Sequence, residues 1–255
     1  MVKFADDVPD DDAYEETPPF QAKLRDIQRW NKEWARYLGK GWERYLAHHT
    51  DYPETPKLPD DPKGLIPLLL GPHSPLEIYC DREWVEGQRM MELGCGCGTL
   101  GKLLARYAKS YLGVDFSTLA LQVGRITSPS NCTYIQCADT AKLEPFFGQI
   151  DTVISRHFWI HQNLTMGQSN LDYYQRFVRK GGRVYLDFFR LDQSRMDQDL
   201  LVLPPTSRLS KSHPSATFQW EQKHVDTLLA KRPFKVLRDE VHKKMQRWYV
   251  VLERT

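Results

Sequence analysis

The chain has 255 residues, of which 41% are hydrophobic, and its 35 basic and 33 acidic side chains leave a net charge of +2. This length suits one full domain with an extension, and the near-neutral charge gives no reason to expect a nucleic acid partner. No apolar run is long enough to cross a bilayer. The first residues turn acidic at once and lack the apolar core of a secretion signal. Because the five cysteines then suit a reducing compartment, we expect a cytoplasmic protein without a membrane partner.

The first third of the chain reads as an extension. Residues 1–17 are acidic, and we expect them to form a mobile tail. Apolar side chains then recur at spacings of three, four and seven, which predicts one face of a helix; they are Phe20, Leu24, Ile27, Trp34 and Leu38. Glycines end this helix, a shorter one is expected over 42–48, and a proline-rich connector follows. We therefore assign residues 18–84 to a helical cap and connector.

The remaining residues alternate between strand and helix patterns. We expect strands over 88–93, 110–115, 133–137, 150–155 and 183–189, with helices over 99–109, 118–126 and 171–179. A helix over 219–231 precedes two last strands, 234–241 and 247–252. The loop between these strands has no room for a helix, so they should pair antiparallel. The fold class predicted for residues 85–255 is α/β: a Rossmann-like three-layer sandwich with a mostly parallel seven-stranded sheet and an antiparallel C-terminal hairpin.

Glycines crowd the turn between the first strand of this domain and its helix, at Gly94, Gly96 and Gly98. A residue without a Cβ lets the backbone turn sharply and lets a ligand approach it, and the helix beyond offers free N–H groups. We therefore predict a small molecule with an adenosine-like part. Residues 96–101 satisfy G-x-G-x-x-G, the dinucleotide pattern, so the loop alone leaves a dehydrogenase open.

The overlapping stretch 92–98 resembles the E-x-G-x-G-x-G motif of class I S-adenosylmethionine-dependent methyltransferases. The segment that begins at Asp151 resembles the family's "FD-x-V" strand, although Ile150 stands where the family has Phe. Residues 179–184 resemble its "L-K-P-G-G" turn without the proline, and a reversed last strand is the family's topological mark. The order of these features favours a methyltransferase, with S-adenosylmethionine as its cofactor, over a dehydrogenase.

The resemblance also assigns roles to cofactor-binding residues. Glu92 would face the methionine end of the cofactor and Asp139 the adenine amino group, whereas Asp115, at the tip of the second strand, suits both ribose hydroxyls in either ligand class. The full expected set is Glu92, Gly94, Cys95, Gly96, Gly98, Asp115, Phe116, Ala138, Asp139 and Ser155. We expect no metal, because Cys95 and Cys97 lack a second ligand pair at a suitable spacing.

The tip of the fourth strand, residues 155–163, is the richest polar and aromatic cluster of the chain. His157 or His161 could act as the catalytic base, because the pKa of histidine lies near neutrality. Arg156 could pair with a substrate carboxylate or phosphate. Together with it, the expected acceptor-binding residues are Tyr37, Trp42, Tyr45, Phe158 and Trp159. The alternative is that these side chains only pack or cap helices.

The function that we expect is methyl transfer to an oxygen or nitrogen atom of a small molecule. The fourth-strand tip lacks the Pro-Pro-aromatic pattern typical of enzymes that methylate nucleobase amines. Two rival interpretations remain open at this point. One is methylation of a protein or an RNA, and the other is a binding module that keeps the fold without catalysis.

Overall fold

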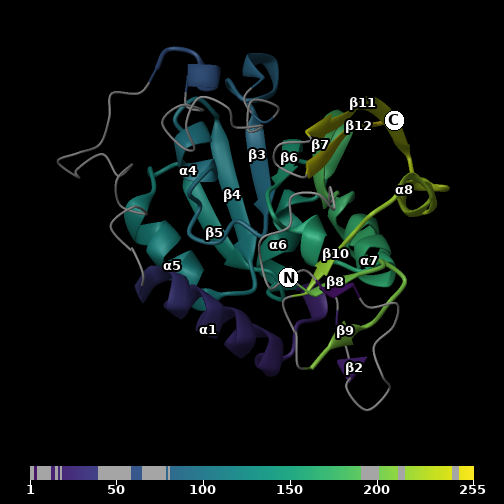
Figure 1. Cartoon of the computed structure of the whole chain (residues 1–255). Coiled ribbons are helices and arrows are strands. Elements are labelled where there is room, and N and C mark those ends of the chain that lie inside the picture. The colour runs from purple at the N-terminus through teal and green to yellow at the C-terminus, as the bar shows by residue number, and fades with distance from the viewer. Residues whose placement is uncertain are drawn as a thin grey trace.

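The computed structural model describes residues 3–4, 13–14, 17, 19–39, 59–64, 79, 81–190, 201–211, 216–242 and 247–255. Its centre is a seven-stranded sheet with the order β11-β12-β7-β6-β3-β4-β5 (Figure 1). The strands are β3 Arg89–Leu93, β4 Ser110–Asp115, β5 Cys132–Gln136, β6 Ile150–Ser155, β7 Val178–Phe189, β11 Phe234–His242 and β12 Arg247–Arg254. Neighbours from β5 to β7 pair in parallel, whereas β12 is antiparallel to both β7 and β11. The predicted fold class and closing hairpin are confirmed.

Helices cover both faces of this sheet. They are α4 Gly101–Leu104, α5 Thr118–Thr127, α6 Thr140–Leu143, α7 Leu164–Tyr174 and α8 Gln222–Leu229. Residues of α6, α7 and α8 belong to one hydrophobic cluster with one face of the sheet, and residues of α4 and α5 belong to a second cluster with the other face. Short 3-10 helices lie at Pro19–Gln21, Pro62–Gly64, Arg82–Trp84, Glu144–Phe146 and Trp159–His161. None of the helices within the described ranges is long and apolar enough to cross a membrane.

Two predicted helices differ from the structure. The helix expected over 99–109 shrinks to α4, because residues after Leu104 form turns. The helix expected over 171–179 lies earlier, as α7, where the Asn163 side chain caps it by accepting from the N–H of Met166 at 2.9 Å. Strand β7 already begins at Val178, and Gly181, with φ +74°, forms an irregularity inside it instead of a turn before it. The pairing therefore shifts from Ile150↔Val178 to Thr152↔Arg183.

The N-terminal extension is tied to the domain. Helix α1, Leu24–Gly39, lies at the carboxyl ends of the parallel strands, alongside α5 (Figure 1). Its predicted apolar face is partly wrong, since Leu24 is 68% exposed while Asp26 is buried. Strands β1, Lys3–Phe4, and β2, Ala13–Tyr14, pair with β8, Leu201–Leu203, and β9, Leu209–Ser210. Those four residues lie in short strands, and the mobile tail over residues 1–17 stays a prediction.

Strand β8 also pairs with β10, Thr217–Phe218, which completes a small three-stranded sheet. This places the N-terminal strand β1 beside segments near residue 200. The helix expected over 42–48 and most of the proline-rich connector lie outside the described residues.

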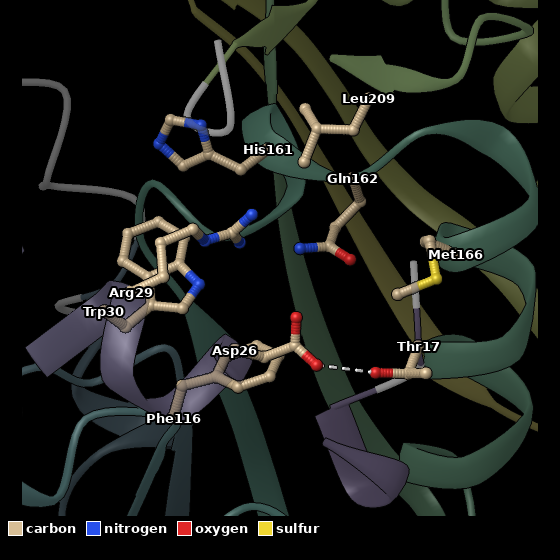
Figure 2. Close-up of a pocket in the computed structure, with 9 residues that line it drawn as sticks. All are labelled: Thr17, Asp26, Arg29, Trp30, Phe116, His161, Gln162, Met166 and Leu209. Atoms are coloured by element: carbon tan, nitrogen blue, oxygen red, sulfur yellow. Dashed lines mark hydrogen bonds between the residues drawn. The ribbon is translucent and has the colours of Figure 1, made fainter. Parts of the chain in front are cut away.

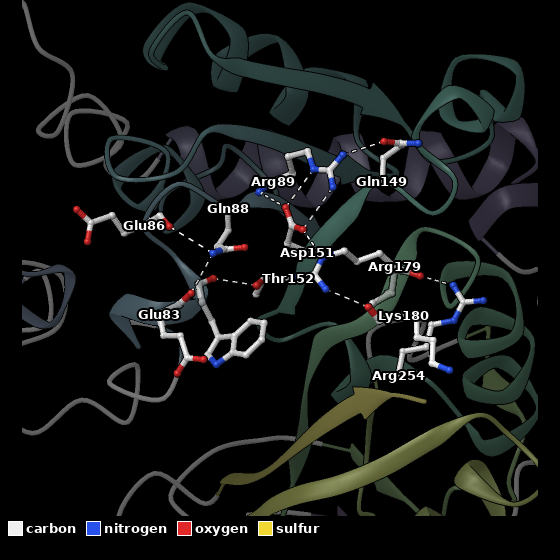
Figure 3. A network of polar contacts seen from close by, with 12 residues as sticks. Glu83, Glu86, Gln88, Arg89, Gln149, Asp151, Thr152, Arg179, Lys180 and Arg254 are labelled. Atoms are coloured by element: carbon white, nitrogen blue, oxygen red, sulfur yellow. Dashed lines mark hydrogen bonds and ion pairs between the residues drawn. The ribbon is translucent and has the colours of Figure 1, made fainter.

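A polar network fastens the amino-terminal edge of the large sheet (Figure 3). The Asp151 carboxylate accepts from the N–H of Arg89 at 2.8 Å and from Nε of Arg89 and of Arg179 at 3.1 and 2.5 Å. Burial raises the pKa of Asp151, but the arginine hydrogen bonds outweigh it and hold that pKa below its ordinary value. Because Asp151 is the second residue of β6, it joins the starts of three strands, at the edge opposite the glycine loop.

Candidate cofactor and acceptor site

The glycine loop follows β3 and turns through three left-handed residues. Gly94, Gly96 and Gly98 have φ values of +66°, +55° and +69°, which side chains with a Cβ rarely adopt. The space around the loop is also closed, because a Cβ on Gly98 would lie 2.1 Å from the Tyr134 hydroxyl oxygen. The sequence therefore needs glycine here for both backbone conformation and packing.

Asp115 braces this loop from the end of β4. Its buried carboxylate accepts from the N–H of Gly96 and from the N–H of Ser117, each at 2.8 Å. Burial raises the pKa of Asp115 to about 6, and these N–H groups oppose the rise. Each carboxylate oxygen has a further lone pair, so Asp115 fits the expected contact with ribose hydroxyls.

Glu92, which precedes the loop, and Cys95, which lies within it, are buried. The Glu92 carboxylate accepts from the Tyr111 hydroxyl at 2.6 Å. Burial raises the pKa of Glu92 to about 7, against the effects of Tyr111 and of the Arg156 charge. Burial also raises the pKa of the Cys95 thiol, which suits a small packing side chain better than a reactive one.

Three other predicted cofactor residues have local partners. The Ser155 hydroxyl donates to the Tyr185 carbonyl at 2.7 Å, inside the sheet. The Asp139 carboxylate pairs with Lys142 at 2.6 Å, and the Ala138 N–H donates to the Gln136 side chain at 2.7 Å. The adenine-binding roles of Ala138 and Asp139 therefore stay predictions.

Helix α1 packs directly on the loop. The Trp34 ring lies so close to Gly96 that a Cβ there would be 2.0 Å from it. The Asn31 side-chain oxygen accepts from the Ser117 hydroxyl at 2.8 Å and from the Leu119 N–H at 3.1 Å, at the start of α5. Sequence reasoning put Trp34 on the apolar face but did not predict either residue as part of the site, because a helical pattern does not reveal where the helix docks.

The aromatic residues predicted to bind the acceptor have mixed outcomes. Tyr37 on α1 is 44% exposed and meets the Trp34 ring edge-on, while Trp42 and Tyr45 lie outside the described residues. Phe158 contacts Gly94, whose added Cβ would be 2.9 Å from its ring. Trp159 is fully buried and packs against Phe158 and Phe188. This packing is the alternative weighed above for Trp159, and its contact with an acceptor stays a prediction.

A pocket lies between α1 and the carboxyl ends of the strands (Figure 2). Figure 2 shows the Arg29 guanidinium reaching between Asp26 and His161. Phe116, which follows β4, stacks with Trp30 at 6.4 Å between ring centroids. The lining comprises Thr17, Asp26, Arg29, Trp30, Phe116, His161, Gln162, Met166 and Leu209.

The two candidate histidines are both held neutral. His157 has a positive φ of +60°. Its backbone N–H donates to the Asp187 carboxylate at 2.8 Å, and its ring Nδ1 accepts from Arg247 at 3.1 Å. Although the His157 side chain is exposed, desolvation by the neighbouring protein and the charges of Arg247 and Arg156 lower its pKa below 6.5. Burial lowers the pKa of His161 to about 4, and its Nδ1 lies 3.1 Å from the Ala216 carbonyl oxygen. Groups with such low pKa values are weak bases.

Residues 91–186 match a protein family described as a methyltransferase domain. Residues 91–186 are therefore a methyltransferase domain, and the sheet order with its reversed last strand is the class I fold. S-adenosylmethionine is therefore its cofactor, and the dinucleotide interpretation of the glycine loop is set aside.

Solved structures share the fold of this methyltransferase chain. The magnesium protoporphyrin IX methyltransferase of Synechocystis, crystallised with S-adenosylhomocysteine, has a TM-score of 0.57 at 14% identity, covering 90% of this chain and 100% of that one. A protein from Pyrococcus horikoshii has a TM-score of 0.55 at 17% identity, covering 84% and 98%. A curated relative, the ubiquinone biosynthesis O-methyltransferase of Erwinia tasmaniensis, is 28% identical over 102 residues. That match spans 39% of this chain and 41% of the relative.

Proposed function

We propose that this protein moves the methyl group of S-adenosylmethionine to an oxygen or nitrogen atom of a small-molecule acceptor. The pocket beneath α1 carries this proposal, because it lies between a covering helix and the strand ends next to the glycine loop. A pocket roofed by a helix suits a small acceptor better than an RNA or a protein surface. The names of two relatives, in ubiquinone biosynthesis and on magnesium protoporphyrin IX, agree with this class.

The residues of the chain divide the work of such a transfer. When bound, the cofactor supplies a methyl group that is already activated by the positive sulfonium charge. Asp115 would hold the ribose, and the glycine loop with Glu92 would hold the methionine end. Trp34 would keep water from the loop, and His157 and His161 stay candidates for the base. Positioning and exclusion of water are the main contributions that the protein has to make.

Calorimetry with S-adenosylhomocysteine tests the cofactor part of this proposal. The wild-type protein should bind it, and Asp115→Ala should weaken binding by about 100-fold, because charge-assisted hydrogen bonds to two hydroxyls are lost. Asp226→Ala, at an exposed site on α8, should leave the affinity unchanged. Binding of NAD in place of S-adenosylhomocysteine would contradict the proposal.

Transfer of a radiolabelled methyl group tests the acceptor class. The protein is incubated with labelled S-adenosylmethionine and separate fractions of cell extract that contain small molecules, proteins or RNA. We expect label in the small-molecule fraction. Label only in the protein or RNA fraction would show that the acceptor is a macromolecule and not a small molecule. Cofactor binding without transfer to any fraction would indicate an inactive binding module.

A further inference from the structure

Four charged residues fall on the same face of the sheet, at its carboxyl edge. Glu92 on β3 has the parity of Met90, and Asp187 on β7 has the parity of Tyr185, both in the second core cluster. Asp187 pairs with Tyr249 of β12, so Arg247, two residues away, shares that face. Arg156 follows β6, where Ile154 belongs to the same cluster. A row of acidic and basic groups therefore runs from the cofactor loop across β6 and β7 to β12.

Asp187 is the centre of this row. It is 1% exposed, and its Oδ2 accepts from the backbone N–H of His157 at 2.8 Å. Its other oxygen, Oδ1, is buried and has no hydrogen-bond partner among the described residues. A buried carboxylate oxygen without a donor is costly, so this atom is available to accept a hydrogen bond from a ligand.

The two arginines of the row also have bonding capacity to spare. Arg247 places Nη2 on His157 and lies over the Phe189 ring at 5.3 Å, while its Nη1 is buried and without a partner in the described ranges. Arg156 forms no hydrogen bond or ion pair with the part of the chain that the structure describes, but its charge lowers the pKa of both Glu92 and Asp187. Arg156 thus lies within electrostatic reach of both the cofactor loop and Asp187.

We propose that Arg156, Asp187 and Arg247 extend the acceptor site beyond the pocket beneath α1, and that the acceptor is a small molecule whose methylated hydroxyl or amine lies near a carboxylate. The charge of Arg247 reaches His161, which lines that pocket. The inference rests on the proposed methyltransferase function and names its substrate class. The acceptor carboxylate binds the two guanidinium groups, whose planar N–H donors match carboxylate oxygens. The hydroxyl or amine donates its hydrogen to Oδ1 of Asp187.

The resulting transfer balances without a further reactant. A lone pair on the acceptor oxygen or nitrogen forms the new bond to the methyl carbon, and the carbon–sulfur bond breaks with its electrons staying on sulfur. The O–H or N–H proton passes to Asp187 and then to water. Burial raises the pKa of Asp187 to about 6, against the effects of Arg247, the His157 N–H and Arg156. Asp187 is therefore a better-matched base near neutral pH than either candidate histidine.

Calorimetry on the complex with S-adenosylhomocysteine tests the carboxylate preference. The probes are benzoate, phenyl phosphate and the neutral benzamide, which are similar in size. Benzoate should bind at least about tenfold more tightly than benzamide, and Arg156→Gln and Arg247→Gln should each remove about tenfold of that advantage. Lys180→Gln, an exposed change of equal charge at the other edge of the sheet, should have no effect. Equal binding of benzamide, or insensitivity to both arginine variants, overturns the proposal, and stronger binding of phenyl phosphate replaces the carboxylate by a phosphate.

The pH dependence of transfer tests Asp187. The charged and titratable groups that face it are Arg156 and His157 after β6, Arg247 and Tyr249 on β12, and Tyr79. With hydroxybenzoates or aminobenzoates as acceptors, kcat should fall below about pH 6 as Asp187 is protonated. Asp187→Asn should lower kcat by about 100-fold and remove that acidic limb while leaving S-adenosylhomocysteine affinity unchanged. An unchanged limb, or faster transfer to phenol and aniline than to the acids, overturns the proposal.

A failure of the methyltransferase function can be distinguished from a failure of the acceptor site. If S-adenosylhomocysteine does not bind the wild-type protein, the methyltransferase function itself fails before any acceptor is added. If it binds but carboxylates do not, only the acceptor site fails. Should Arg247→Gln lose cofactor binding through misfolding, Arg156→Gln and the charge-preserving Arg247→Lys decide the question.

Discussion

The two edges of the central sheet hold their buried carboxylates in opposite electrostatic settings. At the amino-terminal edge, Asp151 receives hydrogen bonds from Arg89 and Arg179, and its pKa is lowered. At the carboxyl edge, Glu92, Asp115 and Asp187 form no ion pair with the described residues, and burial raises their pKa values to about 7, 6 and 6.

The two edges of this sheet therefore contribute differently to the stability of the fold. A carboxylate between two arginines stabilises the fold at neutral pH, whereas an unpaired buried carboxylate costs stability. Ligands of open α/β sheets bind at the carboxyl ends of the strands. The buried carboxylates without an ion pair therefore lie at the edge where we propose that the cofactor and the acceptor bind.

The largest expected effect on stability is at the amino-terminal edge. Asp151→Asn should lower the free energy of unfolding by about 2 to 3 kcal/mol, because two arginines lose their shared carboxylate. Their side chains are 33% and 38% exposed, so water limits the loss. Urea unfolding measures the change, with the exposed Asp226→Asn as a control. S-adenosylhomocysteine affinity should stay at the wild-type value, and its loss in the folded variant would contradict the division between the edges.

At the carboxyl edge, replacing a buried carboxylate should raise the free energy of unfolding instead of lowering it. The pKa of Glu92 is about 7 in the folded protein against an ordinary value of 4.5, so the folded state binds its proton more tightly, and stability falls as the pH rises from 4.5 to 7. Glu92→Gln removes that cost and still accepts from Tyr111. We expect the variant to be about 1 to 2 kcal/mol more stable than the wild type at pH 8.

The same variant provides its own control. Near pH 3 the wild-type Glu92 is protonated in both states, so the difference in the free energy of unfolding should vanish. Asp151 behaves oppositely, since its lowered pKa contributes stability that is lost only as the pH falls below 3.8 and through the folded value. A destabilised Glu92→Gln at both pH values would show that Glu92 is a structural residue.

The strands of this fold could be predicted from the sequence, whereas the contacts between distant segments could not. The strands over 110–115 and 150–155 were predicted with their observed ends, because short apolar runs are bounded by polar residues there. The glycine pair at 181–182 was interpreted as a turn, since a local pattern cannot distinguish a turn from an irregularity inside β7. The pairing of Lys3–Phe4 with β8 joins residues about 200 positions apart and leaves no local signal.

The candidate site shows the same limit. Glu92, the glycines and Asp115 were predicted because a motif orders them along the chain, and the structure brings them together. Asp187 and Arg247 belong to no motif, and only the pairing of β7 with β12 places them on one face. Polar residues at strand ends, sorted by their parity, were the signal that could have found them.

A smaller effect tests the contact between α1 and the glycine loop. Gly96→Ala adds a Cβ at φ +55°, 2.0 Å from the Trp34 ring, so it should destabilise the protein through both strain and overlap. Trp34→Ala removes the overlap alone. In a double-mutant cycle of unfolding we expect a coupling of about 1 kcal/mol. Gly148→Ala, at φ +67° with no neighbour within 4 Å, is the matched control and should add independently to Trp34→Ala.

The smallest effect concerns the side chain that fixes α1 to α5. Asn31→Ala should cost about 0.5 to 1 kcal/mol, since the N–H of Leu119 at the start of α5 loses its acceptor. The loss stays small because the Ser117 hydroxyl still accepts from the N–H of Ala120 at 3.1 Å. Gln28→Ala, exposed on the same helix, should be neutral.

Asn31 also connects stability with cofactor binding. If α1 covers bound S-adenosylhomocysteine, loosening the helix at Asn31 should speed dissociation of that ligand by about threefold, in proportion to the lost contact. Stopped-flow fluorescence measures the dissociation rate, and Gln28→Ala gives the baseline. An unchanged rate in a destabilised Asn31→Ala would mean that α1 packs beside the cofactor without covering it. In that case the strand ends alone, without α1, would make the carboxyl edge different from the amino-terminal edge in ligand binding.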